Sequence, residues 1–199
     1  TLMSVLFGLY EPEEGEIRIN GKPARIKNPN DANDLGIGMV HQHFKLVECF
    51  SVLDNIILGV EPVDKLSFLR KKQAREKVME MSRKWGLHVN PDALISDVTV
   101  GMQQRTEILK MLYRENDILI FDEPTAVLTE SEAEQLISVM KKIAESGIAI
   151  IFITHRLDEV MAASNSITIL RDGKLVATRK KEETSIVELA ELMIGRKGE

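Results

Sequence analysis

Two adjacent carboxylates follow a short apolar run near the middle of the chain. The run is Ile118–Phe121, and Asp122 and Glu123 come directly after it, before Pro124 and Thr125. An unbroken apolar run is typical of a strand buried in a parallel sheet, and ligands of such sheets bind at the carboxyl ends of the strands. Two like charges there call for a nearby cation. Mg²⁺ carried by phosphates would supply it, with Asp122 holding the metal through its water shell and Glu123 polarising a water for attack.

The acid pair alone would also fit a solvated turn, and two further residues favour the chemical interpretation. His155 ends the next apolar run, Ile148–Ile153. A single histidine at a strand end is usually a structural hydrogen-bond donor. Here it follows the acid strand and a capped helix, and this order predicts that it contacts a γ-phosphate and the attacking water. Gln42 follows a third, glycine-containing run, and its neutral amide could both sense Mg²⁺ and orient water, although most such glutamines are polar loop residues.

A fourth group opens a predicted helix. Its members are a hydroxyl, a glycine and the two residues after it: Thr99, Gly101, Met102 and Gln103. Backbone N–H groups and the dipole at a helix start can face an anion. The alternative is that Thr99 is only an N-cap. Beside the other motifs, we favour a nucleotide-binding role.

The elements between these residues predict an α/β fold. Strands are expected at 16–19, 36–40, 118–121, 148–153, 167–170 and 175–178, with hairpin turns at Asn20-Gly21 and Asp172-Gly173. Helices are expected at 1–8, at 74–85 before Gly86, and at 102–113. Two more are expected to begin at capping boxes: one at Thr129/Glu132, ending at Gly147, and one at Ser185/Glu188, ending at Gly195. Strand, helix and strand in succession imply a right-handed parallel crossover.

Composition excludes several classes of protein. The 199 residues are 44% hydrophobic and 29% charged, which is globular, and the net charge of -5 disfavours a nucleic-acid binder that works by bulk charge. The single Cys49 excludes a disulfide framework. No apolar run approaches the about 18 residues that a membrane helix needs.

The phosphate-binding loop expected beside such a site does not occur in these residues. The required pattern is G-x-x-x-x-G-K-[ST], whose backbone wraps phosphates. The nearest stretch runs from Gly15 to Gly21-Lys22, with one residue too many between the glycines and Pro23 in place of Ser or Thr. Because it also lies in a predicted hairpin, it is not a phosphate loop.

The motifs occur in the order found in the nucleotide-binding domain of ABC transporters, and the whole chain resembles that family. Gln42 matches its Q-loop, 98–105 its signature motif, Asp122-Glu123 its Walker B acids and His155 its switch histidine. The resemblance implies a P-loop NTPase-like ABC ATPase domain. Its mostly parallel core sheet would occupy 1–53 and 115–199, with an inserted helical, signature-bearing subdomain at 54–114 and antiparallel hairpins at the margins.

The resemblance also implies an ATPase that uses ATP and Mg²⁺. Implied catalytic residues are Glu123, His155 and Gln42; implied nucleotide contacts are Asp122, Thr99, Gly101, Met102 and Gln103; implied metal contacts are Asp122 and Gln42. Thr1-Leu2-Met3 looks like the stretch after the family's Walker A motif, so we expect the chain to begin just past the phosphate loop. We therefore expect these 199 residues alone to be inactive and, with a strand missing from the sheet, to self-associate.

Departures from the family's usual motifs indicate a subfamily. The usual L-S-G-G-Q is replaced by residues 98–102, Val-Thr-Val-Gly-Met, and the usual S-A-L-D by 126–129, Ala-Val-Leu-Thr. Such variants resemble bacterial sugar and nucleoside importers whose ATPase subunit carries two fused halves. Residues 39–44 look like the nucleoside type, which works with a basic-membrane-protein lipoprotein. This implies permease subunits and a second nucleotide-binding half as partners, the lipoprotein indirectly, no nucleic acid, and a peripheral place on the cytoplasmic face of the bacterial membrane.

Two other functions stay open from the sequence. A soluble ABC ATPase of translation or DNA repair would usually carry basic nucleic-acid surfaces or long insertions, and neither is found. The third possibility is a non-catalytic interaction module. Glu123 and His155 argue against it for the parent protein, whereas the absence of a phosphate loop from these 199 residues argues for it here.

Overall fold

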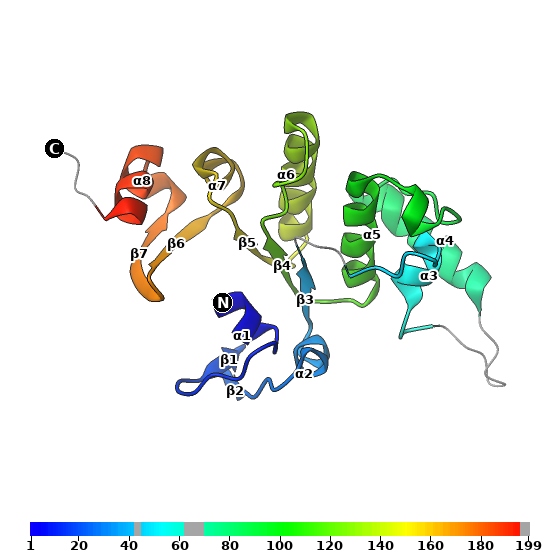
Figure 1. Cartoon of the computed structure of the whole chain (residues 1–199), viewed down its shortest axis with the longest axis horizontal. Helices are drawn as coiled ribbons and strands as arrows, with labels where there is room; N and C mark the ends of the chain where they lie inside the picture. The colour runs from blue at the N-terminus through cyan, green and yellow to red at the C-terminus, as the bar shows by residue number, and fades with distance from the viewer. Residues whose placement is uncertain (42–44, 62–69, 196–199) are drawn as a thin grey trace.

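The centre of the molecule is a three-stranded parallel sheet. The computed structural model describes residues 1–41, 45–61 and 70–195. The strands are β3 (Ile37–Val40), β4 (Ile118–Asp122) and β5 (Ala149–Ile153), in that spatial order (Figure 1). Phe121 pairs with Val40 on one side and with Phe152 on the other. The predicted parallel α/β core is thus confirmed, and all three strands end at the same edge.

Helices and two hairpins surround this sheet. The α-helices are α1 (Leu2–Leu6), α2 (Pro29–Asp34), α3 (Val52–Ile57), α4 (Lys71–Trp85), α5 (Val100–Tyr113), α6 (Glu130–Glu145), α7 (Leu157–Ala163) and α8 (Ile186–Ile194). Short 3₁₀ turns are η1 (Ile95–Asp97) and η2 (Lys181–Glu183). Helix α5 begins earlier than the predicted Met102 because Thr99 is its N-cap, and α1 ends before Leu9. Helix α4 ends where predicted, since Gly86 takes the left-handed conformation that closes a helix.

Both hairpins form at the predicted turns. The strands are β1 (Ile17–Ile19) with β2 (Lys22–Ala24), and β6 (Ser166–Arg171) with β7 (Lys174–Lys180). Asn20-Gly21 and Asp172-Gly173 all have positive φ angles, as a two-residue hairpin turn requires. Sequence chemistry at the turn therefore determined where these strands pair.

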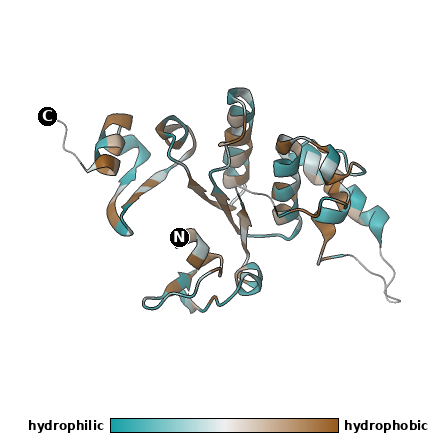
Figure 2. Ribbon diagram, viewed as in Figure 1, coloured by the Kyte–Doolittle hydropathy of each residue, from teal (hydrophilic) through white to brown (hydrophobic). Residues whose placement is uncertain are grey.

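Alternate residues of β4 divide the apolar core between the two faces of the sheet. Leu119 and Phe121 belong to one core cluster together with residues of α3, α4, α5 and α6, while Ile120 belongs to another with Phe7, Ile37 and other residues near the N-terminus. Figure 2 shows the hydrophobic colouring of these central strands between the two groups of helices. A separate cluster joins the β6–β7 hairpin to α7 and α8. In the described ranges, no helix is both long and apolar enough to cross a bilayer.

The prediction that 148–153 is a buried strand is wrong. Ala149 is exposed and the rest of β5 is only half-buried, whereas Leu119, Ile120 and Phe121 of β4 are fully buried. The cause is position: β5 pairs with β4 along one edge and with no other strand among the described residues. Apolar sequence alone does not distinguish a central strand from one at the edge of the sheet.

The two predicted capping boxes have different outcomes. At α6, Glu132 N–H donates to the Thr129 hydroxyl (3.3 Å) and Thr129 N–H donates back to the Glu132 carboxylate (2.9 Å). At α8, Glu188 N–H donates to the Ser185 hydroxyl (3.3 Å), but the Glu188 carboxylate accepts from Arg179 and Thr184 instead. The prediction of a full capping box at α8 is therefore wrong: the hydrogen bond from the Ser185 N–H to the Glu188 carboxylate does not form, because Arg179 and Thr184 donate to that carboxylate instead.

We expect Thr129→Ala to lower the free energy of unfolding by about 1 kcal/mol, because it removes the hydroxyl that caps α6. Thr129→Ser keeps the hydroxyl and should stay near the parent protein. Urea denaturation followed by circular dichroism measures both. Equal losses in the two variants would show that the methyl group, not the cap, matters.

Candidate active site at the carboxyl ends of the parallel strands

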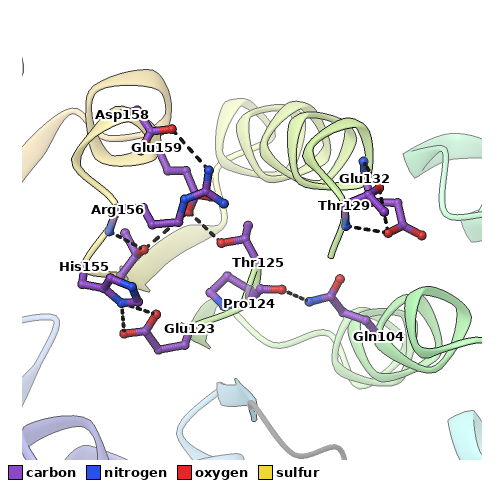
Figure 3. A network of polar contacts seen from close by, with 11 residues as sticks. Gln104, Glu123, Pro124, Thr125, Thr129, Glu132, His155, Arg156, Asp158 and Glu159 are labelled. Carbon is purple, nitrogen blue, oxygen red and sulfur yellow. Dashed lines mark hydrogen bonds and ion pairs between the residues drawn. The ribbon is translucent and has the colours of Figure 1, made fainter. Parts of the chain in front are cut away.

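Glu123 and His155 meet where β4 and β5 end. The N–H of Glu123 donates to the Ile153 carbonyl (2.9 Å), which extends the parallel pairing past Asp122. His155 Nδ1 lies 3.1 and 3.2 Å from the two carboxylate oxygens of Glu123 (Figure 3). The structure thus brings together the predicted acid and histidine.

The backbone of Glu123 is unusual for a residue with a side chain. Its φ of 46° lies in the left-handed region, which costs a non-glycine residue about 1–3 kcal/mol. The Glu123 side chain is 26% exposed and that of His155 is 73% exposed. A contact in which one partner is largely exposed contributes little stability. The pair therefore does not offset the backbone cost, which is typical of a functional position rather than a structural one.

Asp122 ends β4 one residue earlier and has an unpredicted histidine near it. Burial, together with the charge of Lys45, lowers the pKa of His41, while the charge of Asp122 acts to raise it. The His41 ring also meets Phe7 edge-on, with centroids 5.7 Å apart. His41 precedes Gln42 at the end of β3, so its place after a strand was the signal that could have found it.

Of the two residues predicted to contact a metal, the structure describes one. Asp122 is described, whereas Gln42 lies outside the described residues. Within the described part of the chain, no three His, Cys, Asp or Glu side chains are grouped to hold a metal ion. Mg²⁺ usually keeps several waters and binds proteins through one or two carboxylates plus substrate phosphates, so the carboxylate of Asp122 is a fitting donor.

The predicted signature residues form a second group at the start of α5. The Thr99 hydroxyl accepts from Met102 N–H (3.3 Å), and Gln103 donates to the Ile95 carbonyl (3.4 Å). A side-chain carbon at Gly101 would lie 3.2 Å from a carboxylate oxygen of Glu132, the end of a flexible side chain on α6. Among the described residues, no hydrogen bond or ion pair joins this group to the acid pair or to His155.

Two buried side chains that sequence reasoning missed hold the loop after Glu123. Gln104 of α5 donates to the Pro124 carbonyl (2.5 Å), and Glu159 of α7 accepts from the Thr125 hydroxyl (2.7 Å) (Figure 3). Gln104 and Glu159 are each 3% exposed. Gln104 lies within the signature stretch 98–105 and Glu159 in the first turn of α7, but only the fold shows what these side chains contact.

Comparison with known proteins identifies the family. The sequence profile described as "ABC transporter" matches residues 1–126. The chain belongs to the ABC transporter family. Two curated relatives of this ABC transporter chain are the Nucleoside import ATP-binding protein NupA of Lactococcus lactis subsp. cremoris, 54% identical, and the Guanosine import ATP-binding protein NupO of Bacillus subtilis, 53% identical. Each match covers 98% of this chain and 38% of the relative, so the chain spans less than half of their length.

Solved structures confirm the fold of this ABC transporter chain. MJ1267, an ATP-binding cassette of an ABC transporter, matches with a TM-score of 0.81 at 22% identity, over 96% of this chain and 81% of that one. CbiO1 from Clostridium perfringens matches with a TM-score of 0.76 at 23% identity, over 97% of this chain and 75% of that one. The predicted ABC ATPase fold is therefore confirmed.

Proposed function

We propose that this chain is the part of an ABC importer ATPase subunit that carries the catalytic acid and the switch histidine. The observation that carries the proposal is the contact of 3.1 Å between His155 Nδ1 and Glu123 at the ends of adjacent parallel strands. Such an edge is where α/β sheets bind ligands. A partly exposed acid in contact with an exposed histidine there suits the activation of water.

Glu123 is the residue that polarises the attacking water. Its carboxylate accepts the proton while the water oxygen bonds to the γ-phosphorus of ATP and the bond to the bridging oxygen breaks. Mg²⁺, when bound, neutralises charge on the phosphates, and Asp122 is the described residue that would hold it.

His155 complements this acid. In the neutral ring, an Nδ1–H donated to Glu123 leaves Nε2 as an acceptor; protonation makes Nε2 a second donor that can meet a phosphate oxygen. Gln42 keeps its proposed role of sensing the metal and orienting water. The three residues thus divide proton transfer, phosphate contact and metal sensing.

The residues at the start of α5 are proposed to contact a nucleotide as well, but not the one next to Glu123. Thr99, Gly101, Met102 and Gln103 would present backbone N–H groups to phosphate. Because no hydrogen bond or ion pair among the described residues joins this group to Glu123 or His155, we propose that it faces the ATP of the other nucleotide-binding half. The second half is therefore one proposed partner.

Membrane permease subunits are the other direct partners, with a substrate-binding lipoprotein acting through them. In this proposal 54–114 is the helical subdomain that grips the permease, and 1–53 with 115–199 is the ATPase core. The protein then sits peripherally on the cytoplasmic face of the bacterial membrane. The names of two relatives more than half identical to this chain favour a nucleoside as the imported solute.

Reconstituted transport tests the proposal. The intact ATPase subunit, its permease subunits and the receptor are placed in liposomes with ATP on the side of the ATPase. We expect a labelled nucleoside to accumulate with ATP but not with ADP, and excess ribose not to compete. Competition by ribose would assign a sugar importer instead, and hydrolysis that never supports uptake would favour a soluble ABC ATPase.

A further inference from the structure

Glu159 is a carboxylate buried in α7, outside the residues assigned above. It is 3% exposed. Removing a carboxylate from water is unfavourable unless hydrogen bonds and opposite charge compensate it. Its partners therefore show what the fold gains by burying it.

Those partners come from two different loops. The Thr125 hydroxyl donates to Glu159 Oε2 (2.7 Å), and the Thr154 hydroxyl lies 3.4 Å from the same oxygen. Arg156 Nη1 is 3.0 Å from the other oxygen, Oε1. The N–H of Arg156 also donates to the Thr154 hydroxyl (3.1 Å). Figure 3 shows Glu159, Thr125 and Arg156 beside the Glu123–His155 pair.

Each loop carries one residue of that pair. Thr125 follows Glu123 after a single proline, and Thr154 directly precedes His155. One oxygen of Glu159 is thus within hydrogen-bonding distance of hydroxyls next to the proposed acid and next to the proposed histidine. Gln104 holds the Pro124 carbonyl from the other side, so the acid loop is fixed from α5 and from α7.

We propose that Glu159 is a positioning residue that sets the distance between Glu123 and His155 by holding both loops. The proposal rests on the proposed function of that pair. The contact within the pair holds its geometry only weakly, because His155 is 73% exposed and contacts to an exposed partner contribute little free energy. Catalytic groups need placement within a fraction of an ångström, and buried supporting groups provide it.

The test removes one hydroxyl from the intact ATPase subunit. Thr125→Val keeps the shape but loses the bond to Glu159, whereas Thr125→Ser keeps the hydroxyl. We expect Thr125→Val to slow single-turnover ATP hydrolysis by about ten- to a hundredfold with ATP affinity unchanged, and Thr125→Ser to restore most of the rate. The imidazole resonance of His155, identified by its loss in His155→Gln, should shift in Thr125→Val and not in Thr125→Ser.

A buried hydroxyl far from the site gives the matched control. Ser82→Ala removes the hydrogen bond from the Ser82 hydroxyl to the Leu87 carbonyl (2.7 Å) in α4. If it lowers the melting temperature as much as Thr125→Val but leaves the rate and the His155 resonance unchanged, positioning is supported. If Thr125→Val hydrolyses ATP at the parent rate and Glu123→Gln is inactive, the proposed role of Glu159 is overturned, but the proposed function is not. An active Glu123→Gln would instead overturn the proposed function.

Discussion

Glu123→Gln is expected to lower the rate of ATP hydrolysis by about a hundredfold or more while ATP still binds. Glutamine keeps the shape of the side chain and can still accept a hydrogen bond from His155, but it cannot take a proton from water as a carboxylate does, and general-base catalysis contributes about 10²- to 10⁴-fold. Phosphate release by the intact ATPase subunit measures the rate, and binding of a fluorescent ATP analogue measures affinity.

Two further variants show whether the effect belongs to the site. His155→Ala should also reduce hydrolysis strongly, because it removes the ring whose Nε2 is proposed to meet a phosphate oxygen. Glu134→Gln removes the same charge from an exposed position on α6 and should stay near the parent rate. Hydrolysis by Glu123→Gln within a few-fold of the parent protein would contradict the role of the acid.

Local signals in the sequence were sufficient for the elements that carry this pair. The apolar run before Asp122 predicts β4, Asp172-Gly173 predicts a hairpin, and Thr129 with Glu132 predicts the start of α6. In each case, the residues that set the structure are neighbours in the chain. The common edge of the parallel strands then follows from strand order, and it brings Glu123 and His155 together.

Features that depend on contacts distant in sequence could not be predicted. The half-exposed state of β5 depends on which strands flank it, and the Glu188 carboxylate binds Arg179 because the hairpin places that side chain nearby. Glu159 is separated from Thr125 by 34 positions. No local pattern distinguishes such a buried glutamate from an acid in the first turn of a solvated helix.

A second buried acid, Glu107, has a large expected effect on stability. It lies on α5, is 2% exposed, and its Oε2 has no hydrogen-bond partner among the described residues. Burial raises its pKa from 4.5 to about 7, although the backbone groups of His41 and Lys45 and the charges of Lys110 and Lys45 act to lower that pKa. In the folded protein, the carboxyl group therefore keeps its proton up to near neutral pH.

The sign of the pH dependence follows from this raised pKa. Between pH 4.5 and about 7 the unfolded chain has released a proton that the folded protein still holds, so stability falls as pH rises through this range. The full cost, reached above pH 7, is about 3 kcal/mol. His41, whose pKa burial lowers, acts in the opposite direction, so only the difference between a variant and the parent isolates Glu107.

Glu107→Gln should therefore be more stable than the parent at pH 8 by up to about 3 kcal/mol, with the gain shrinking toward pH 5. Glutamine keeps the size of the side chain but has no charge to desolvate, so the cost of burying the charged carboxylate is removed. Urea denaturation at several pH values measures the difference, and Glu134→Gln on the exposed face of α6 provides the matched control. A gain that does not change with pH would mean that packing or hydrogen bonding, rather than the buried charge, limits stability at this position.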